Sequence, residues 1–180
     1  MRTIFYGFIF IYMNFQLNLG DSSIGLIPSF IGYWLMLKGL TDLSAESEHF
    51  VRLQPIVFGM GIFTLVLYIL DLLGIATDTV FPGLVLGLIS IVMSIFITYN
   101  LVQGVREMEQ GYGADLNGEQ LQSRWIYLAV TLLAANLLFW MPFVNIAAVL
   151  AALVFIILFL AAFYRSMTFY EAIPAEVPQP

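Results

Sequence analysis

Cysteine is absent from this chain of 180 residues, histidine occurs once, and charged side chains make up only 10% of it. Without cysteine, disulfides, thiolate metal sites and cysteine nucleophiles are excluded. The single histidine, His49, excludes a metal site built from several histidines. It stands in a short polar stretch beside Glu46 and Glu48, where we expect a solvated connector.

Signatures of catalysis and of nucleic-acid binding are also missing. The chain has no His-Glu-x-x-His motif of a metalloprotease and no Gly-x-Ser-x-Gly motif of a serine hydrolase. Its net charge of −6 argues against a nucleic-acid partner, because such proteins neutralise phosphates with lysine and arginine. We therefore expect no catalytic residues, no metal and no cofactor.

Apolar residues, in contrast, are in excess. They form 61% of the chain, whereas a soluble domain has about 45–50% apolar and about 25% charged residues. The mean hydropathy is +0.95. A chain of this size has no interior large enough for that excess, but a lipid bilayer accepts it. The composition therefore predicts an integral membrane protein with the bilayer as its surroundings.

Six segments are long and apolar enough to be membrane helices, which need roughly 20 residues to cross about 30 Å of hydrocarbon. They are residues 3–19, 24–40, 56–75, 80–102, 125–141 and 143–163. Proline stands at the start of the second, fourth and sixth segments, at Pro28, Pro82 and Pro142, and the first helical turn tolerates it. We predict an all-α, polytopic transmembrane helical bundle of three hairpins over residues 1–170. An acidic, proline-rich disordered tail over residues 171–180 is expected to follow.

The basic residues predict how the helices are oriented. If the N-terminus is cytoplasmic, one side of the membrane carries all six of them, namely Arg2, Lys38, Arg52, Arg106, Arg124 and Arg165. The opposite loops then contain Asp21 and Asp78 and no basic residue. Cytoplasmic loops of membrane proteins are enriched in lysine and arginine. The sequence therefore predicts a multi-pass protein of the cell membrane with both termini in the cytoplasm.

Asp71 is the candidate centre of a polar site, because an ionisable side chain inside hydrocarbon is normally paired, protonated or facing water. Thr64 and Tyr68 share its helical face. Other polar residues fall at the same predicted depth, near the outer side of the membrane: Asn14, Gln16, Asn18 and Asn136. Two interpretations remain open. These residues bind a cation or polar solute, or they form interhelical hydrogen bonds and line the headgroup region.

Small residues at a spacing of four mark candidate helix-packing surfaces. They are Gly83 and Gly87 in the fourth segment, and Ala147 and Ala151 in the sixth. Small side chains let two helix backbones approach closely. Such stripes serve packing within one chain, a homo-oligomer or the helix of a partner membrane protein, and the sequence does not decide among the three.

The run Leu26-Ile27-Pro28-Ser29-Phe30-Ile31-Gly32-Tyr33 is followed by Leu35, by Gly39-Leu40 and then by Ser47 and Phe50. With this pattern, residues 24–75 resemble a group of small uncharacterised polytopic membrane proteins of Gram-positive bacteria. Members often have aspartate where this chain has Ser29. The resemblance implies membrane topology and names no activity.

These observations give two functional hypotheses. The first is a non-enzymatic accessory or interaction protein of the cytoplasmic membrane. The alternative is a solute-binding or transport protein, such as a small transporter subunit, with an outward-facing polar site around Asp71.

Overall fold

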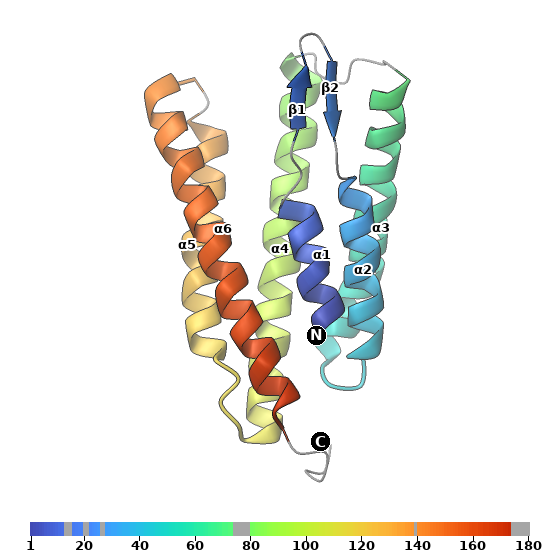
Figure 1. Ribbon diagram of the computed structural model, residues 1–180, viewed down its shortest axis with the longest axis vertical. Coiled ribbons are helices and arrows are strands. Elements are labelled where there is room, and N and C mark those ends of the chain that lie inside the picture. The colour runs from blue at the N-terminus through green and yellow to red at the C-terminus, as the bar shows by residue number, and fades with distance from the viewer. Residues whose placement is uncertain (13–15, 20–21, 26–27, 74–79, 139, 174–180) are drawn as a thin grey trace.

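The computed structural model describes residues 1–12, 16–19, 22–25, 28–73, 80–138 and 140–173. Within these residues the chain forms six α-helices and one antiparallel β-hairpin (Figure 1). In chain order they are α1 (Arg2–Tyr12), β1 (Gln16–Leu19), β2 (Ser22–Gly25), α2 (Ser29–Asp42), α3 (Glu48–Leu72), α4 (Val80–Tyr112), α5 (Gly118–Leu137) and α6 (Pro142–Glu171). The predicted helical fold class is confirmed.

The helices stand side by side, and the start of α1 and the end of α6 lie toward the same end of the bundle (Figure 1). We call this the terminal end, and we call the opposite end, where β1 and β2 lie, the far end. Helix α2 packs against α1 and α3, and α4 packs against α3 and α5. Helix α6 packs against α5 and, less extensively, against α1. The α5–α6 hairpin leans away from the other helices toward the far end (Figure 1).

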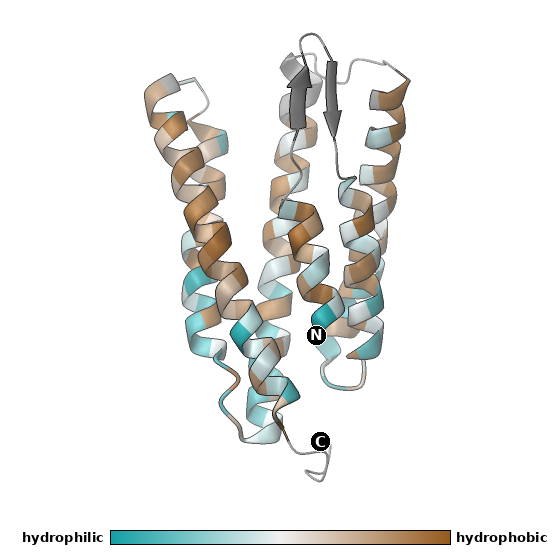
Figure 2. Cartoon of the chain, viewed as in Figure 1, coloured by the Kyte–Doolittle hydropathy of each residue, from teal (hydrophilic) through white to brown (hydrophobic). Residues whose placement is uncertain are grey.

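Among the described residues, three helices are long and apolar enough to cross a membrane. These stretches are Glu48–Leu70 in α3, Val85–Tyr112 in α4 and Phe143–Glu171 in α6. Only 22% of the most apolar part of each is buried within the protein, so most of their apolar surface faces outward. Figure 2 shows the apolar residues over the middle and far parts of the helices and the hydrophilic ones toward the terminal end. A bilayer accepts such an outward apolar surface, and water does not.

The first predicted hairpin differs from the structure. Helix α1 ends at Tyr12 and residues 16–19 form β1, so the prediction of a helix over residues 3–19 is wrong at residues 16–19. Helix α2 begins at Ser29, and residues 22–25 form β2 instead of the start of a helix. The reason lies in the sequence Gln-Leu-Asn-Leu of β1, whose polar and apolar residues alternate as strands do. The register pairs Gln16 with Gly25 and Leu19 with Ser22.

The other helices extend past their apolar segments at the terminal end. Helix α3 already begins at Glu48, within the stretch expected to be a connector, and α5 begins at Gly118. Helix α4 continues to Tyr112, and α6 continues to Glu171. Charged and polar residues continue these helices past their apolar segments, because helix formation does not require lipid. The predicted tail over residues 171–180 lies outside the described residues apart from its first three positions.

The buried core occupies the half of the bundle nearest the terminal end. The largest fully buried side chains are Ile4, Phe8, Met36, Leu40, Phe50, Leu53, Ile97, Leu101, Met108, Leu116, Phe159 and Phe163. The ring of Phe8 contacts those of Phe159 and Phe163 edge-on, with centroids 5.5 and 5.2 Å apart. Toward the far end, none of residues 62–70 of α3, 85–96 of α4 and 143–151 of α6 is buried. The helices are therefore tightly packed at one end and loosely packed at the other.

Glycines bring α1 and α2 into backbone contact. A Cβ atom added at Gly32 would lie 2.6 Å from the carbonyl oxygen of Gly7, and one added at Gly7 would lie 2.7 Å from that of Gly32. At Gly39 an added Cβ would meet the Ile4 side chain at 2.5 Å. Small residues at helix contacts of this kind permit the close approach on which packing in membranes depends.

We expect Gly32→Ala to lower the free energy of unfolding by about 1–3 kcal/mol, because its new methyl group overlaps a backbone atom. Gly59→Ala is the matched control in α3, where an added Cβ meets nothing within 4 Å. It should raise the stability by about 0.5–1 kcal/mol through lost backbone entropy of the unfolded chain. Unfolding titrations in detergent micelles measure both values. Equal effects of the two substitutions would contradict the close α1–α2 contact.

Candidate functional site

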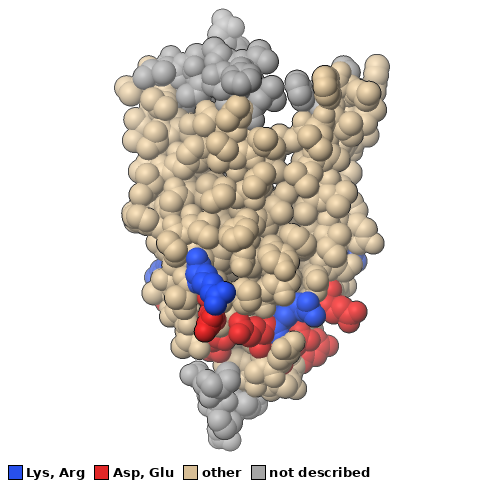
Figure 3. Space-filling view, turned by 180° about the vertical axis from the view of Figure 1, so that it is seen from behind, with Lys and Arg blue, Asp and Glu red and all other residues tan. Residues whose placement is uncertain are grey.

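The charged side chains that the structure describes gather at the terminal end of the protein. Figure 3 shows lysine, arginine, aspartate and glutamate in a band there, below a long surface that has no charged residue in this view. The helix bounds explain this band, because Arg2 and Arg52 lie at the start of a helix, and Arg106 and Arg165 lie near the end of one. The alternating directions of these helices bring the four residues to one end.

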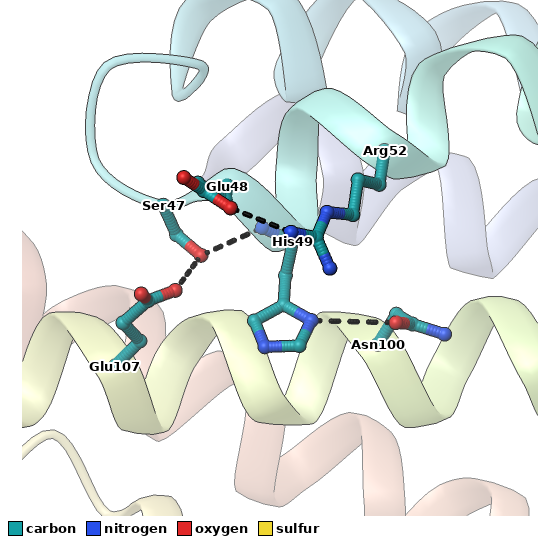
Figure 4. A network of polar contacts seen from close by, with 6 residues as sticks. All are labelled: Ser47, Glu48, His49, Arg52, Asn100 and Glu107. Atoms are coloured by element: carbon teal, nitrogen blue, oxygen red, sulfur yellow. Dashed lines mark hydrogen bonds and ion pairs between the residues drawn. The ribbon is translucent and has the colours of Figure 1, made fainter.

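The connector between α2 and α3 is hydrogen-bonded to α4 (Figure 4). Ser47, which is 6% exposed, donates its hydroxyl to the carboxylate of Glu107. The same oxygen accepts the backbone N–H of His49 at 3.1 Å, which is the usual bond of a helix N-cap. About two turns of α4 from Glu107, toward the far end, the Oδ1 of Asn100 lies 3.3 Å from His49 Nδ1. Serine and histidine thus position the start of α3 on α4.

The contact with Asn100 assigns the tautomer of His49. The amide nitrogen of Asn100 donates to the carbonyl oxygen of Phe96 at 2.9 Å, so its Oδ1 is the acceptor that faces the imidazole. His49 Nδ1 must therefore carry the proton and donate it. The expectation of a solvated connector is wrong for His49, because the residue lies in the first turn of α3 and is partly buried against α4.

Glu46 joins three parts of the chain. Its carboxylate accepts hydrogen bonds from the phenol of Tyr112 at 2.7 Å and from that of Tyr170 at 3.1 Å. The two rings are edge-to-face, with centroids 6.2 Å apart. The α2–α3 connector is thereby held to the C-terminal ends of α4 and α6. A carboxylate that accepts two hydroxyl protons forms charge-assisted bonds, which are stronger than bonds between neutral groups.

Further polar contacts complete this end of the bundle. Arg2 and Glu171 form a two-pronged ion pair with both N···O distances at 2.7 Å, and this carboxylate raises the pKa of the Arg2 guanidinium. Glu109 accepts the backbone N–H of Gly118 at 2.9 Å, at the start of α5. We call Glu46, Ser47, His49, Asn100, Glu107, Glu109, Tyr112, Tyr170 and the Arg2–Glu171 pair the terminal network.

The terminal network connects the helix ends through hydrogen bonds and an ion pair. Its carboxylates each have a described partner from another part of the chain, as given above. No group of three or more histidine, aspartate or glutamate side chains among the described residues is placed to hold a metal ion. These hydrogen bonds join helix ends, and they fix five of the six described helices relative to one another.

The residues of the predicted polar site are not assembled by the described part of the chain. Thr64 donates to the carbonyl oxygen of Met60, in its own helix, at 2.9 Å, and Tyr68 packs its ring on Phe30 at 5.7 Å. Asn136 lies on α5, and α4 stands between that helix and α3. Asn14 and the side chains of Gln16, Asn18 and Asp71 lie outside the described residues.

The predicted packing residues face outward or toward open space where they are described. A Cβ added at Gly87 would meet nothing within 4 Å, and Ala147 is exposed. Ala151 of α6 is partly buried. Gly83 is part of α4, but its surroundings are not among the described features. Gly87 therefore makes no close helix contact with the described part of the chain. Contact with another molecule stays a prediction.

Local sequence signals could have found only part of the terminal network. A serine directly before a helix is a recognisable N-cap, so Ser47 was open to prediction. Tyr112 and Tyr170 are 66 and 124 residues from Glu46, and no local pattern links them. Comparisons with protein-family models, with curated proteins and with solved structures found no match.

We expect Glu46→Ala to lower the free energy of unfolding by about 1–3 kcal/mol, because two phenol groups lose a charged acceptor. Glu48→Ala is the matched control two residues away. Its carboxylate is exposed and pairs with Arg52 only within one helix, so a change within about 0.5 kcal/mol is expected. Unfolding titrations in detergent compare the two variants. Equal losses would show that the contact with Tyr112 and Tyr170 contributes nothing.

Proposed function

We propose that this protein is a multi-pass protein of the cytoplasmic membrane that acts as a non-enzymatic accessory or interaction partner of another membrane protein. The observation that carries this proposal is the division of the surface into an apolar part along the helices and a charged part at the terminal end (Figures 2 and 3). The described charged side chains lie mainly in the charged part, where they form hydrogen bonds and ion pairs with one another and with polar neighbours.

The exposed apolar side chains support the membrane environment. Along α6 the most exposed of them include Phe143 at 89%, Leu150 at 61% and Ile146 at 58%. Burying a side chain of this kind contributes about 1.5–3 kcal/mol, so water around them would be strongly unfavourable. Helices α1 and α2 have only 11 and 14 residues. Six crossings therefore require that α1 together with β1 forms one span and that α2 together with β2 forms another.

The orientation follows from the basic residues. Lysine and arginine belong to the charged band at the terminal end, and positive residues are enriched on the cytoplasmic side of membrane proteins. We propose that the terminal end lies in the cytoplasm. The polar contacts there fix the helix ends, so the outward-facing apolar surfaces of α4, α5 and α6 are what the protein offers to a partner within the bilayer.

Single cysteines test the orientation, because the natural chain contains none. Gln120→Cys places a thiol at an exposed position of the first turn of α5, and Met141→Cys places one at an exposed position between α5 and α6. In intact cells a membrane-impermeant maleimide should label Met141→Cys, and Gln120→Cys only after permeabilisation. The opposite pattern would reverse the topology, and labelling of both in intact cells would argue against a span between them.

Native mass spectrometry of the full chain, extracted gently from its own membrane, tests the functional proposal. A protein subunit that remains bound at a fixed stoichiometry is the expected result. An added mass of a few hundred daltons that disappears in Asp71→Asn would instead support the solute-binding alternative. A chain that carries only bulk lipid would count against the accessory role.

A further inference from the structure

Four polar residues meet where α1 and α6 pack against each other at the terminal end. Arg2 and Tyr6 are four residues apart and lie on one face of α1. Tyr164 and Glu171 are seven residues apart and lie on one face of α6. The ion pair between Arg2 and Glu171 joins these two faces. The ring of Phe5 joins them as well, with its centroid 6.0 Å from that of Tyr6 and 5.4 Å from that of Tyr164. We call Arg2, Tyr6, Tyr164 and Glu171 the seam cluster.

The seam cluster lies where the apolar surface of the two helices ends. No charged residue follows Arg2 within α1, and none precedes Arg165 within α6. Figure 2 shows hydrophilic residues at the start of α1 and toward the end of α6, with apolar ones toward the far end. Tyrosine is enriched where membrane proteins meet lipid headgroups. In a bilayer, the seam cluster is therefore level with the headgroups of one leaflet.

Three hydrogen-bond donors of the seam cluster are unused within the described part of the chain. Arg2 binds Glu171 through Nε and Nη2, so its Nη1 group makes no hydrogen bond to a described residue. The hydroxyl groups of Tyr6 and Tyr164 also have no hydrogen-bond partner among the described residues, and both side chains are exposed. Both phenols lie within electrostatic range of the guanidinium of Arg2. These donors are suited to an acceptor with several oxygens, such as a phosphate.

Glu171 adds an acceptor beside these donors. Each of its carboxylate oxygens accepts one bond from Arg2 and keeps a second lone pair, and the side chain is 32% exposed. The α-amino group of Met1 lies within electrostatic range of both Glu171 and Asp42. Two positive groups therefore stand beside two negative ones. The seam cluster is electrically balanced, and it offers phosphate donors next to a carboxylate acceptor.

We propose that the seam cluster binds the headgroup of a phospholipid whose phosphate is followed by a primary ammonium group, namely phosphatidylethanolamine. The phosphate accepts hydrogen bonds from Nη1 of Arg2 and from the phenols of Tyr6 and Tyr164, and the ammonium group donates to Glu171. The acyl chains lie along the apolar surface of α1 and α6. This inference rests on the membrane environment proposed above and not on the accessory role.

The charges and donors of the seam cluster select this headgroup over two common alternatives. The choline ammonium group has no N–H, so it forms no hydrogen bond with the carboxylate of Glu171. A phosphatidylglycerol headgroup has a net negative charge, and the balanced cluster has no surplus positive charge to compensate it. It also brings no cation to Glu171. A zwitterionic headgroup with a primary ammonium group satisfies both parts of the cluster.

Native mass spectrometry of the full chain in detergent micelles measures how tightly the first lipid binds. The probes are dioleoyl phospholipids that differ only in their headgroups: phosphatidylethanolamine, phosphatidylcholine and phosphatidylglycerol. We expect phosphatidylethanolamine to bind about tenfold more tightly than phosphatidylcholine, the difference expected for one charge-assisted hydrogen bond. Phosphatidylglycerol should also bind more weakly than phosphatidylethanolamine. Equal binding of the ethanolamine and choline lipids, or tightest binding of the glycerol lipid, overturns the proposal.

Tyrosine substitutions test the phosphate contacts. Tyr6→Phe and Tyr164→Phe each keep the ring and remove one donor. Each should weaken the binding of both the ethanolamine and the choline lipid by about fivefold, as expected for one lost hydrogen bond. Tyr127→Phe is the matched control, because Tyr127 is an exposed tyrosine of α5 whose ring stacks on Phe155, away from the seam cluster. It should leave binding unchanged, and equal effects of all three substitutions overturn the phosphate contacts.

A glutamate substitution tests the ammonium contact. Glu171→Gln removes the negative charge and should abolish the preference for phosphatidylethanolamine over phosphatidylcholine. Glu48→Gln is the matched control, because Glu48 also pairs with an arginine, Arg52, but within α3. It should keep the preference. A preference that survives in Glu171→Gln, or that is lost equally in Glu48→Gln, overturns the contact. These outcomes are independent of the accessory role, which is measured by a bound protein subunit.

Discussion

Packing at the terminal end is the constraint on which the rest of this structure depends. Lipid is as apolar as the helices themselves, so the hydrophobic effect does not press helices together inside a bilayer. Close van der Waals contact and hydrogen bonds have to do so instead. The contact between Gly7 and Gly32 provides the first, and Glu46 with its two tyrosines provides the second. Both belong to the half of the bundle where the core side chains are buried.

Hydrogen bonds outside the apolar segments complement those contacts. A bond between helices within a membrane contributes only about 0.6 kcal/mol on average, so several are required to hold a bundle. The terminal network places its bonds where α4 and α6 extend past their apolar stretches, and there carboxylates are tolerated. Toward the far end none of residues 85–96 of α4 and 143–151 of α6 is buried, and the α5–α6 hairpin leans away from the other helices (Figure 1). The open space beside Gly87 belongs to this loosely packed half.

Sequence reasoning succeeded where one physical rule dominated. Long apolar runs predicted α3, α4 and α6. It was wrong at residues 16–19 and 24–25, where a length criterion for membrane helices outweighed the alternation of Gln16 to Leu19. The predicted depth of Asn136 and Thr64 in the membrane also suggested that these two residues belong to one site. The structure separates them by a helix, because equal depth does not specify which helices are neighbours.

The sequence by itself determined the apolar character of this protein, the segregation of its charge and the approximate positions of its helices. Each of these follows from composition and from the periodicity of a single segment. Only the tertiary structure decided that Glu46 meets Tyr112 and Tyr170, that Gly32 rather than Gly87 is a close helix contact, and that Tyr12 faces Ser94. These are pairings between distant segments, and they depend on how helices lean and rotate against one another. No local pattern encodes that geometry, because it results from the packing of all six helices at once.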